Sequence, residues 1–222
     1  MAARTYGQYC GITTAVELVA ERWALLIVRD LLVGPRRYTD LKQGMPKIPT
    51  NILATRLKEL QDGGVIQRVA LPRCGLVYEL TDYGRDLEPI VLALGRWGFR
   101  SMDEPKDDDV VTAAALTMTL RTAFRPESVT PPLDFQIVVD EVELHAQVID
   151  GTLSVVQIAP SMPPVGGTLP DGDPELRFST GPGLRHLIGG TVTAAQAVEQ
   201  GIVTITTGEL ALLERFAQIF RL

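Results

Sequence analysis

An acidic, proline-containing segment at residues 102–109 constrains this 222-residue chain most, because it separates two parts of opposite charge. The segment has no apolar periodicity, which is typical of a linker. Residues 1–103 contain 14 Lys and Arg against 11 Asp and Glu, a net charge of +3. Residues 104–222 contain 7 against 16, a net charge of −9. We therefore expect two domains, 1–103 and 111–222, joined by an acidic linker at 104–110.

The net charge of the whole chain, −6, taken alone argues against a nucleic-acid partner. A phosphate backbone is bound mainly by Lys and Arg, which an acidic protein lacks in excess. The division shows that this figure averages two unlike parts. Only the first part has a charge balance that suits DNA.

Composition excludes several other classes of protein. No stretch approaches the roughly 20 uninterrupted apolar residues of a membrane span. The first residues lack the apolar core of a secretion signal, so we expect a cytoplasmic protein. Two cysteines, Cys10 and Cys74, are too few for a disulfide scaffold, and His145 and His186 form no ligand cluster for a metal. No catalytic or cofactor-binding motif is present, so we predict neither an enzyme nor a bound cofactor.

The first part begins with apolar residues at helical spacing over residues 12–32, which we interpret as helix. Gly34 and Pro35 end it, and a short helix is expected at 38–42. Pro49 suits the first turn of the next helix, at 49–61. Leucines at 53, 57 and 60 define its inward face.

The opposite face of the helix at 49–61 carries small polar and basic residues. Such a face suits the major groove of DNA, because short side chains let the backbone approach while amide and hydroxyl groups reach base edges. An ordinary amphipathic surface helix would show the same pattern. The helix alone therefore does not decide the function.

Two segments that alternate like strands follow, at 65–70 and 76–80, with a turn at 72–75. They predict a hairpin with arginines on and beside its tip. A final helix is expected to begin near Thr81, a capping residue, and to reach Gly98. Helices, a hairpin and a closing helix are the order of a winged helix-turn-helix domain.

An ordered series of residues over about 7–101 consists of Cys10, Arg22-Trp23, the Arg-Asp-Leu-Leu of 29–32, the Gly-Pro-Arg-Arg-Tyr of 34–38, Asn51-Ile52-Leu53, Arg56-Leu57, Leu60, Tyr78, Leu80-Thr81, Gly84 and Trp97-Gly98. In these residues the chain resembles the HxlR-type winged-helix transcriptional regulators. The resemblance implies a homodimer, held by the N-terminal segment and the long final helix. It also implies that the helix at 49–61 reads the major groove of an operator while the wing touches the DNA backbone or minor groove.

The candidate DNA-binding residues follow from this resemblance. Those expected near the bases are Thr50, Asn51, Thr55 and Lys58. Those expected near phosphates are Arg36, Arg37, Arg56, Arg68 and Arg73. Arg56 flanks the leucine stripe, so pairing with Glu59 or Asp40 is an alternative for it. Tyr38 is expected to pack under the short helix, and Arg22 and Trp23 to be structural.

Cys10 is a candidate redox sensor, because some members of the family use an N-terminal cysteine in this way. The chemistry needs an exposed thiol with a lowered pKa. No base is adjacent to Cys10 in the sequence. The alternative is an inert, partly buried thiol at the dimer contact.

The second part predicts a separate α+β domain. Helical patterns alternate with strand patterns, and Asp150-Gly151 signals a tight turn between two of the strands. Helices are expected at 111–125, 184–188, 193–199 and 209–220, and strands at 135–139, 142–148, 152–156, 176–180 and 203–206, with a loop rich in proline and glycine at 160–174.

This order, and the spacing of the stretches at 173–180, 184–190 and 197–205, resembles the sterol carrier protein domain. The resemblance implies a sheet backed by helices around an apolar tunnel for lipid-like ligands. Residues that simply fill a core would show the same pattern. The candidate pocket residues are Phe135, Ile137, Leu144, Phe178, Leu213 and Phe216.

Together these patterns predict a bacterial, dimeric transcriptional regulator whose partner is a double-stranded DNA operator. An apolar or lipid-like small molecule in the second domain would modulate it. The alternative is a lipid-binding carrier whose winged helix serves mainly for dimerisation. A second domain with no ligand at all is a further alternative.

Overall fold

The computed structural model divides into two units, Met1–Val91 and Leu92–Leu222. The division falls after Val91, ten residues before the acidic segment at 102–109 and inside a helix, so the end of this helix belongs with the second unit. The described residues are 5–72, 74–106, 108–128, 131–158 and 172–222.

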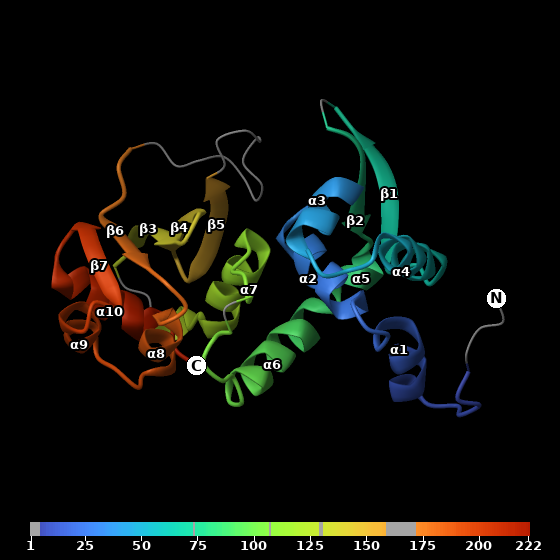
Figure 1. Ribbon diagram of the computed structural model, residues 1–222, viewed down its shortest axis with the longest axis horizontal. Coiled ribbons are helices and arrows are strands. Elements are labelled where there is room, and N and C mark those ends of the chain that lie inside the picture. Colours follow the sequence, from blue (N-terminus) through green and yellow to red (C-terminus); the bar gives the residue numbers. More distant parts are fainter. Residues whose placement is uncertain (1–4, 73, 107, 129–130, 159–171) are drawn as a thin grey trace. The chain divides into compact units, whose positions relative to one another are not determined.

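The first unit contains helices followed by a two-stranded hairpin and two closing helices (Figure 1). Its core is one cluster of apolar side chains from α2, α3, α4 and the hairpin. The elements are α1 (Gly11–Val19), α2 (Ala24–Val33), α3 (Tyr38–Gly44), α4 (Thr50–Asp62), β1 (Ile66–Leu71), β2 (Gly75–Leu80), α5 (Asp82–Arg85) and α6 (Glu88–Phe99).

The helical region expected over 12–32 is interrupted, which corrects the sequence-based interpretation. The chain leaves the helix after Val19, and Trp23 takes a left-handed conformation with φ 81° before α2 begins. The Arg22 guanidinium lies over the Trp23 ring, 5.0 Å from its centroid. Helix α1 has no buried residue, whereas α2 has six. The two helices therefore have different surroundings, which the spacing of apolar residues along the sequence does not reveal.

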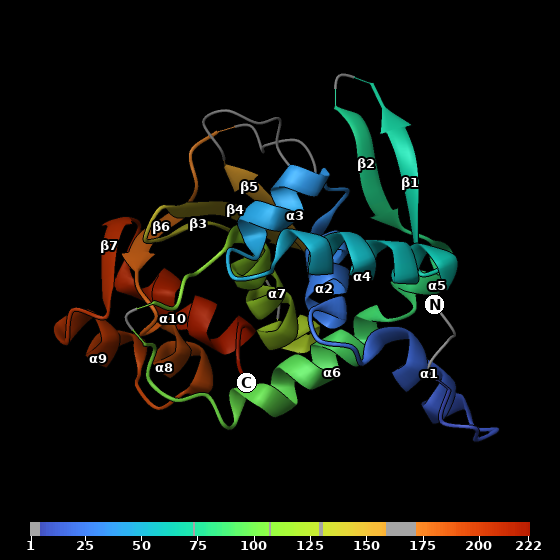
Figure 2. The same cartoon turned by 45° about the vertical axis from the view of Figure 1, so that its right-hand side comes forward.

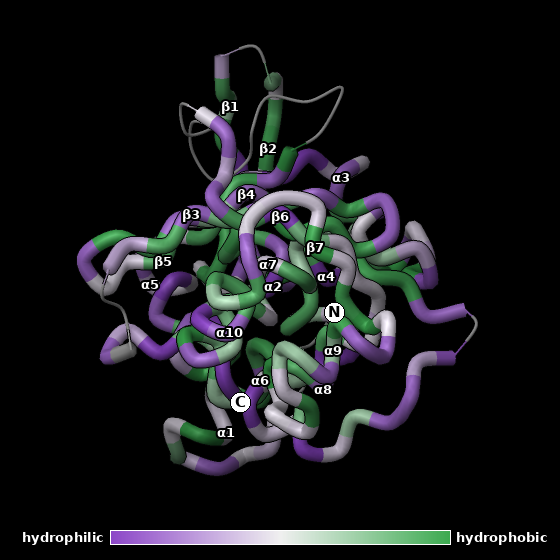
Figure 3. The backbone as a smooth tube through the Cα atoms, turned by 90° about the vertical axis from the view of Figure 1, so that its left-hand side faces the viewer, coloured by the Kyte–Doolittle hydropathy of each residue, from purple (hydrophilic) through white to green (hydrophobic). Residues whose placement is uncertain are grey.

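The wing is the antiparallel hairpin of β1 and β2, which extends away from α2–α5 in Figure 2. Val77 and Leu80 turn inward, while Gln67 and Arg68 are exposed. Both hydrophobic and hydrophilic residues occur along the wing, as the hydropathy colours of Figure 3 show. Backbone hydrogen bonds between Arg36 and Tyr78, at 2.9 and 2.7 Å, attach the base of the wing to the segment before α3.

The closing helix predicted after Thr81 forms as two helices, α5 and α6. The predicted cap is confirmed, because the Thr81 hydroxyl accepts a hydrogen bond from the Gly84 amide at 3.0 Å. Gly84 is packed so closely that a Cβ there would lie 2.0 Å from the carbonyl oxygen of Val65. This contact holds the start of α5 against the residues that precede β1.

The second unit is an α+β arrangement around a five-stranded sheet of order β5-β4-β3-β6-β7. Strands β3 and β6 are parallel, and the other neighbours are antiparallel. The elements after α6 are α7 (Ala113–Ala123), η1 (Pro126–Ser128), β3 (Leu133–Val139), β4 (Val142–Ile149), β5 (Thr152–Ile158), β6 (Leu176–Thr180), α8 (Leu184–Gly189), α9 (Ala194–Glu199), β7 (Val203–Thr207) and α10 (Leu210–Ile219).

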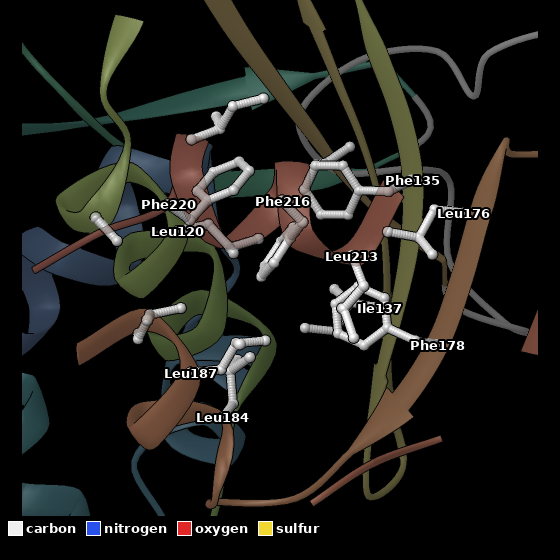
Figure 4. Close-up of a cluster of buried hydrophobic side chains, with 14 of the residues drawn as sticks. Leu120, Phe135, Ile137, Leu176, Phe178, Leu184, Leu187, Leu213, Phe216 and Phe220 are labelled. Carbon is white, nitrogen blue, oxygen red and sulfur yellow. The ribbon is translucent and has the colours of Figure 1, made fainter. Parts of the chain in front are cut away.

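Helices α7, α8, α9 and α10 contribute to one core against one face of this sheet. Figure 4 shows side chains from β3 and β6 meeting those of α7, α8 and α10. The rings of Phe135 and Phe178 each contact Phe216 edge to face, with centroids 5.1 and 5.0 Å apart. Such aromatic pairs add about 0.5–1.5 kcal/mol each beyond the burial of their area.

The acidic segment forms neither helix nor strand in its described residues, 102–106 and 108–110. Arg185 donates one hydrogen bond to Glu104 and another to the carbonyl of Met102 at 2.9 Å, and Glu104 Oε1 lies 3.6 Å from His186 Nε2. This end of the segment is therefore attached to α8.

Candidate nucleic-acid interface

Helix α4 presents two contrasting faces. Leu53, Leu57 and Leu60 are at most 2% exposed and anchor it in the core of the first unit. On the outer side Thr50, Asn51 and Lys58 are exposed, and Thr55 is partly exposed. The helix thus offers hydroxyl, amide and ammonium groups to a partner while its backbone is fixed from behind.

The start of α4 is held by its neighbours. Pro49 occupies the N-cap position just before the helix. The helix therefore begins at Thr50, one residue later than the sequence predicts. The Tyr38 hydroxyl donates a hydrogen bond to the carbonyl oxygen of Thr50 at 2.9 Å. The Thr55 hydroxyl donates to the carbonyl of Asn51 at 2.8 Å, so it can accept a hydrogen bond from a base but must rotate away to donate one. Tyr38 also packs on the core cluster, as the sequence predicts.

Arg56 faces two carboxylates of its own unit. Its guanidinium pairs with Glu59 on the next turn, which is one of the alternatives raised from the sequence, and with Glu21 at 3.1 Å. Its side chain is only 14% exposed. This arginine ties α4 to the segment between α1 and α2.

Arg36 is buried, at 8% exposure. Burial lowers the pKa of its guanidinium, and the charges of Asp30 and Asp40 oppose that shift. Asp30 is itself buried, and burial raises the pKa of its carboxyl against the opposing charges of Arg29 and Arg36. Arg29 donates two hydrogen bonds to Asp30, at 2.8 and 2.7 Å. These groups form an internal charged cluster.

Asp30 is not among the candidates that the sequence indicates. A sequence signal is present, because Asp30 lies three residues after Ile27 on the inward stripe of α2, where a buried charge requires a partner. Its hydrogen-bonding partner Arg29 is its neighbour in sequence, whereas Arg36, whose charge also acts on the Asp30 carboxyl, comes from beyond the end of the helix. Helical spacing therefore could not bring Arg36 to Asp30.

The wing brings further cations to the same unit. Arg37 is exposed, and its Nε donates to the carbonyl of Cys74 in the hairpin turn at 2.7 Å. Arg68 is exposed on β1, with its guanidinium 5.8 Å from the centroid of the Tyr78 ring. Arg73, the remaining phosphate candidate, lies outside the described residues.

Cys10 is exposed and precedes the first residue of α1. Hydrogen bonding by the backbone of Thr13 and Ile12 lowers the pKa of its thiol below the ordinary value. Both described cysteines are free thiols. An exposed thiol with a lowered pKa is what the sensor chemistry needs, and burial of this thiol at a dimer contact remains the alternative.

The six candidate pocket residues of the second unit come together in its core. Each is 0% exposed, and the phenylalanine rings among them pack on one another. They are Phe135, Ile137, Leu144, Phe178, Leu213 and Phe216. All six belong to the core cluster of this unit, and Figure 4 labels all but Leu144 between the sheet and α10.

The opposite face of the sheet carries a polar network that the sequence analysis missed. His145 Nε2 lies 2.5 Å from Asp134 Oδ1, and Gln147 donates to the other oxygen of this carboxylate at 2.6 Å. Asp134 and Gln147 are directly opposite in the pairing of β3 with β4. Only the strand register, which no single strand reveals, brings these groups together.

The described residues contain no group of three or more His, Cys, Asp or Glu side chains arranged to hold a metal ion. Their helices include none with the length and apolar character needed to span a membrane.

An anchored helix with an exposed polar face, preceded by two core helices and followed by a basic hairpin, defines the winged helix-turn-helix class of DNA-binding domain. Within that class, the model of the HxlR-like helix-turn-helix family matches residues 18–106. The chain is 35% identical over 91 residues to the uncharacterized HTH-type transcriptional regulator YvaP of Bacillus subtilis. That match covers 40% of this chain and 84% of YvaP. The chain belongs to the HxlR-like family.

Other relatives carry the same kind of name. The HTH-type transcriptional regulator YodB of Bacillus subtilis is 33% identical over 86 residues, which are 38% of this chain and 77% of YodB. The solved structure of the reduced form of YodB has 31% identity and a TM-score of 0.38, and it covers 45% of this chain and 100% of that chain. The family model ends at residue 106, so most of the second unit lies beyond it.

Proposed function

We propose that this chain is a transcriptional regulator that binds a double-stranded DNA operator as a homodimer, at inverted half-sites. The observation that carries the proposal is the outer face of α4, where Thr50, Asn51 and Lys58 are exposed over a buried leucine stripe. In this family of helix-turn-helix proteins such a helix enters the major groove, where amide and ammonium groups reach base edges.

The cations divide into two groups in this proposal. Arg37, Arg68 and Arg73 contact phosphates, the first two because they are exposed beside or on the wing. Arg36 and Arg56 are positioning residues, because each faces carboxylates inside its own unit. Lys58 is free to turn to DNA, since its pair with Asp62 at 2.7 Å is exposed on both sides and contributes little.

Exposed apolar side chains support the homodimer. Ile90, Leu94 and Trp97 on α6 are spaced i, i+4, i+7 and so share one face, and Trp97 is 70% exposed. Ile12 on α1 and the preceding Tyr9 are also exposed. Apolar residues grouped in this way mark an interaction surface. A second copy of the chain would cover them.

The test uses a duplex selected from a random-sequence library by the full chain. Replacing Asn51 and Lys58 together with alanine should weaken binding at least tenfold. Loss of the Lys58 contact should also reduce the slope of log affinity against log salt by about one per subunit. Lys106→Ala, which removes one exposed charge from the linker, is the matched control. An unchanged affinity and slope in the double variant would favour the carrier alternative.

The second unit is proposed to sense an apolar ligand, as its resemblance to the sterol carrier domain implies. Its order of strands and helices supports this proposal. Because the six candidate pocket side chains are packed together, a ligand could enter only if their rings separate. Solvent extraction of the purified protein followed by mass spectrometry should recover a bound lipid, and its removal should change operator affinity. If the purified protein contains no lipid and its operator affinity is the same with and without added lipid, the second unit has a structural role only.

A further inference from the structure

Four arginines of the second unit line one cavity of about 390 Å³. Arg96 lies in the last turn of α6, Arg100 directly follows that helix, Arg125 follows α7, and Arg221 follows α10. The other lining residues include Phe99 and Phe124, and none of the eight is acidic. Two of these arginines, Arg125 and Arg221, come from the acidic part of the chain, where Lys and Arg are outnumbered by Asp and Glu.

The cavity is built by close contacts among these elements. A Cβ on Gly95 would lie 3.0 Å from the Thr122 side chain, so α6 passes close to the end of α7. The segments after α7 and α10 run antiparallel: Arg125 donates its amide to Ile219, and Arg221 donates to Ala123, both at 2.8 Å. This pairing brings the side chains at positions 125 and 221 to the same cavity.

The guanidiniums are not neutralised by the protein around them. Arg96 donates to the carbonyl of Thr122 at 3.3 Å and Arg125 to that of Arg221 at 3.2 Å. Among the described residues, none of the four lies within ion-pair distance of an Asp or Glu side chain. A carboxylate on Leu222 would cancel one of these charges and still leave positive charge in excess.

Like charges held close together cost free energy unless an anion lies between them. Phe99 and Phe124 provide an apolar wall, and the volume is within the range of sites for small ligands. We propose that this pocket binds a small organic carboxylate, with its charged head on the arginines and an aromatic or short alkyl body against the two phenylalanines. The proposal does not depend on DNA binding. It concerns a site separate from the buried apolar core of the same unit.

The ligand class can be tested with 2-naphthoate and the full-length protein by titration calorimetry. We expect saturable binding of one molecule per chain that weakens as salt is raised. The uncharged analogue 2-naphthalenemethanol, which has the same ring system, should bind at least tenfold more weakly. Absence of naphthoate binding, or equal binding of the two compounds, would overturn the proposal.

Variants locate the site. Arg100 is exposed, and the structure shows no hydrogen bond from its side chain, so Arg100→Gln should retain the fold. The affinity of this variant for naphthoate should fall about tenfold. Arg177→Gln removes one charge from the same unit at a surface pair with Glu143 and should leave the affinity unchanged. Equal effects of the two variants would show non-specific attraction, which contradicts a site.

A further variant moves a cation without removing it. The Arg221 guanidinium lies so close to Gly190 that a Cβ there would meet its carbon at 1.8 Å. Gly190→Ala should therefore displace Arg221 and weaken naphthoate binding. A thermal melt checks for the strain of alanine at φ +69°. Full affinity in a folded Gly190→Ala protein would exclude Arg221 from the site.

Discussion

At the scale of single residues, surroundings rather than residue type decide what a charged or reactive side chain does. Arg36, Arg37 and Arg56 all lie near the predicted DNA-binding helix in sequence. The first is buried near Asp30, the second is exposed beside the wing, and the third pairs with Glu21 and Glu59. Only the second remains available for a phosphate.

Cys10 provides a prediction at this scale. Because backbone hydrogen bonding lowers the pKa of its thiol, more of the reactive thiolate is present at a given pH than in an unfolded chain. In a Cys74→Ser background, the rate of iodoacetamide labelling should reach half its maximum at a lower pH in the native protein than in urea. The order would be reversed if the thiol were buried in the dimer, as the alternative requires.

At the scale of elements, close packing of backbone decides which glycines are needed. Gly84 in α5 and Gly98 in α6 both lie in helices, yet a Cβ would lie 2.0 Å from Val65 O at the first and meets nothing within 4 Å at the second. The same substitution therefore has opposite consequences at the two positions.

Gly84→Ala should destabilise the protein by about 2 kcal/mol or more, because backbone must shift to admit the methyl group. Gly98→Ala should stabilise it by up to about 1 kcal/mol, the difference in helix propensity. Urea denaturation monitored by circular dichroism measures both. Destabilisation of equal size at both positions would contradict this assignment of the packing.

The exposed face of α6 gives a second prediction for an element. Leu94→Glu with Trp97→Glu should dissociate the proposed homodimer, because two carboxylates would be buried in each half of the contact. Val198→Glu on α9 also places a charge at an exposed apolar position and should have no effect. Light scattering after gel filtration gives the mass. A dimer that survives the α6 variant would place the contact elsewhere.

At the scale of the whole molecule, the unequal distribution of charge means that the first part of the chain attracts DNA and the second part repels it. The second part carries a net charge of −9, which repels a polyanion at distances up to about 10 Å in 0.1 M salt. The acidic second part therefore weakens non-specific binding of the chain to DNA. Specific binding then depends on direct contacts with the operator and on dimerisation.

Neutralising acidic residues of the second unit should test this. Asp140, Glu141 and Asp150 are exposed at turns, and their amide equivalents suit the left-handed conformations of the two aspartates. The triple variant should bind non-specific DNA more tightly at 50 mM salt and equally at 500 mM. An unchanged affinity at low salt would show that this charge does not reach the DNA.

The sequence by itself determined the order of the elements, the leucine stripe of α4, the cap at Thr81 and the division of charge. These features depend on periodicity and on neighbours a few residues apart. The tertiary structure decided the break before α2, the burial of Arg36, the pair of His145 with Asp134 and the meeting of four arginines. Each of these depends on groups that are distant in the chain or on surroundings supplied by other elements, and local spacing carries no information about them.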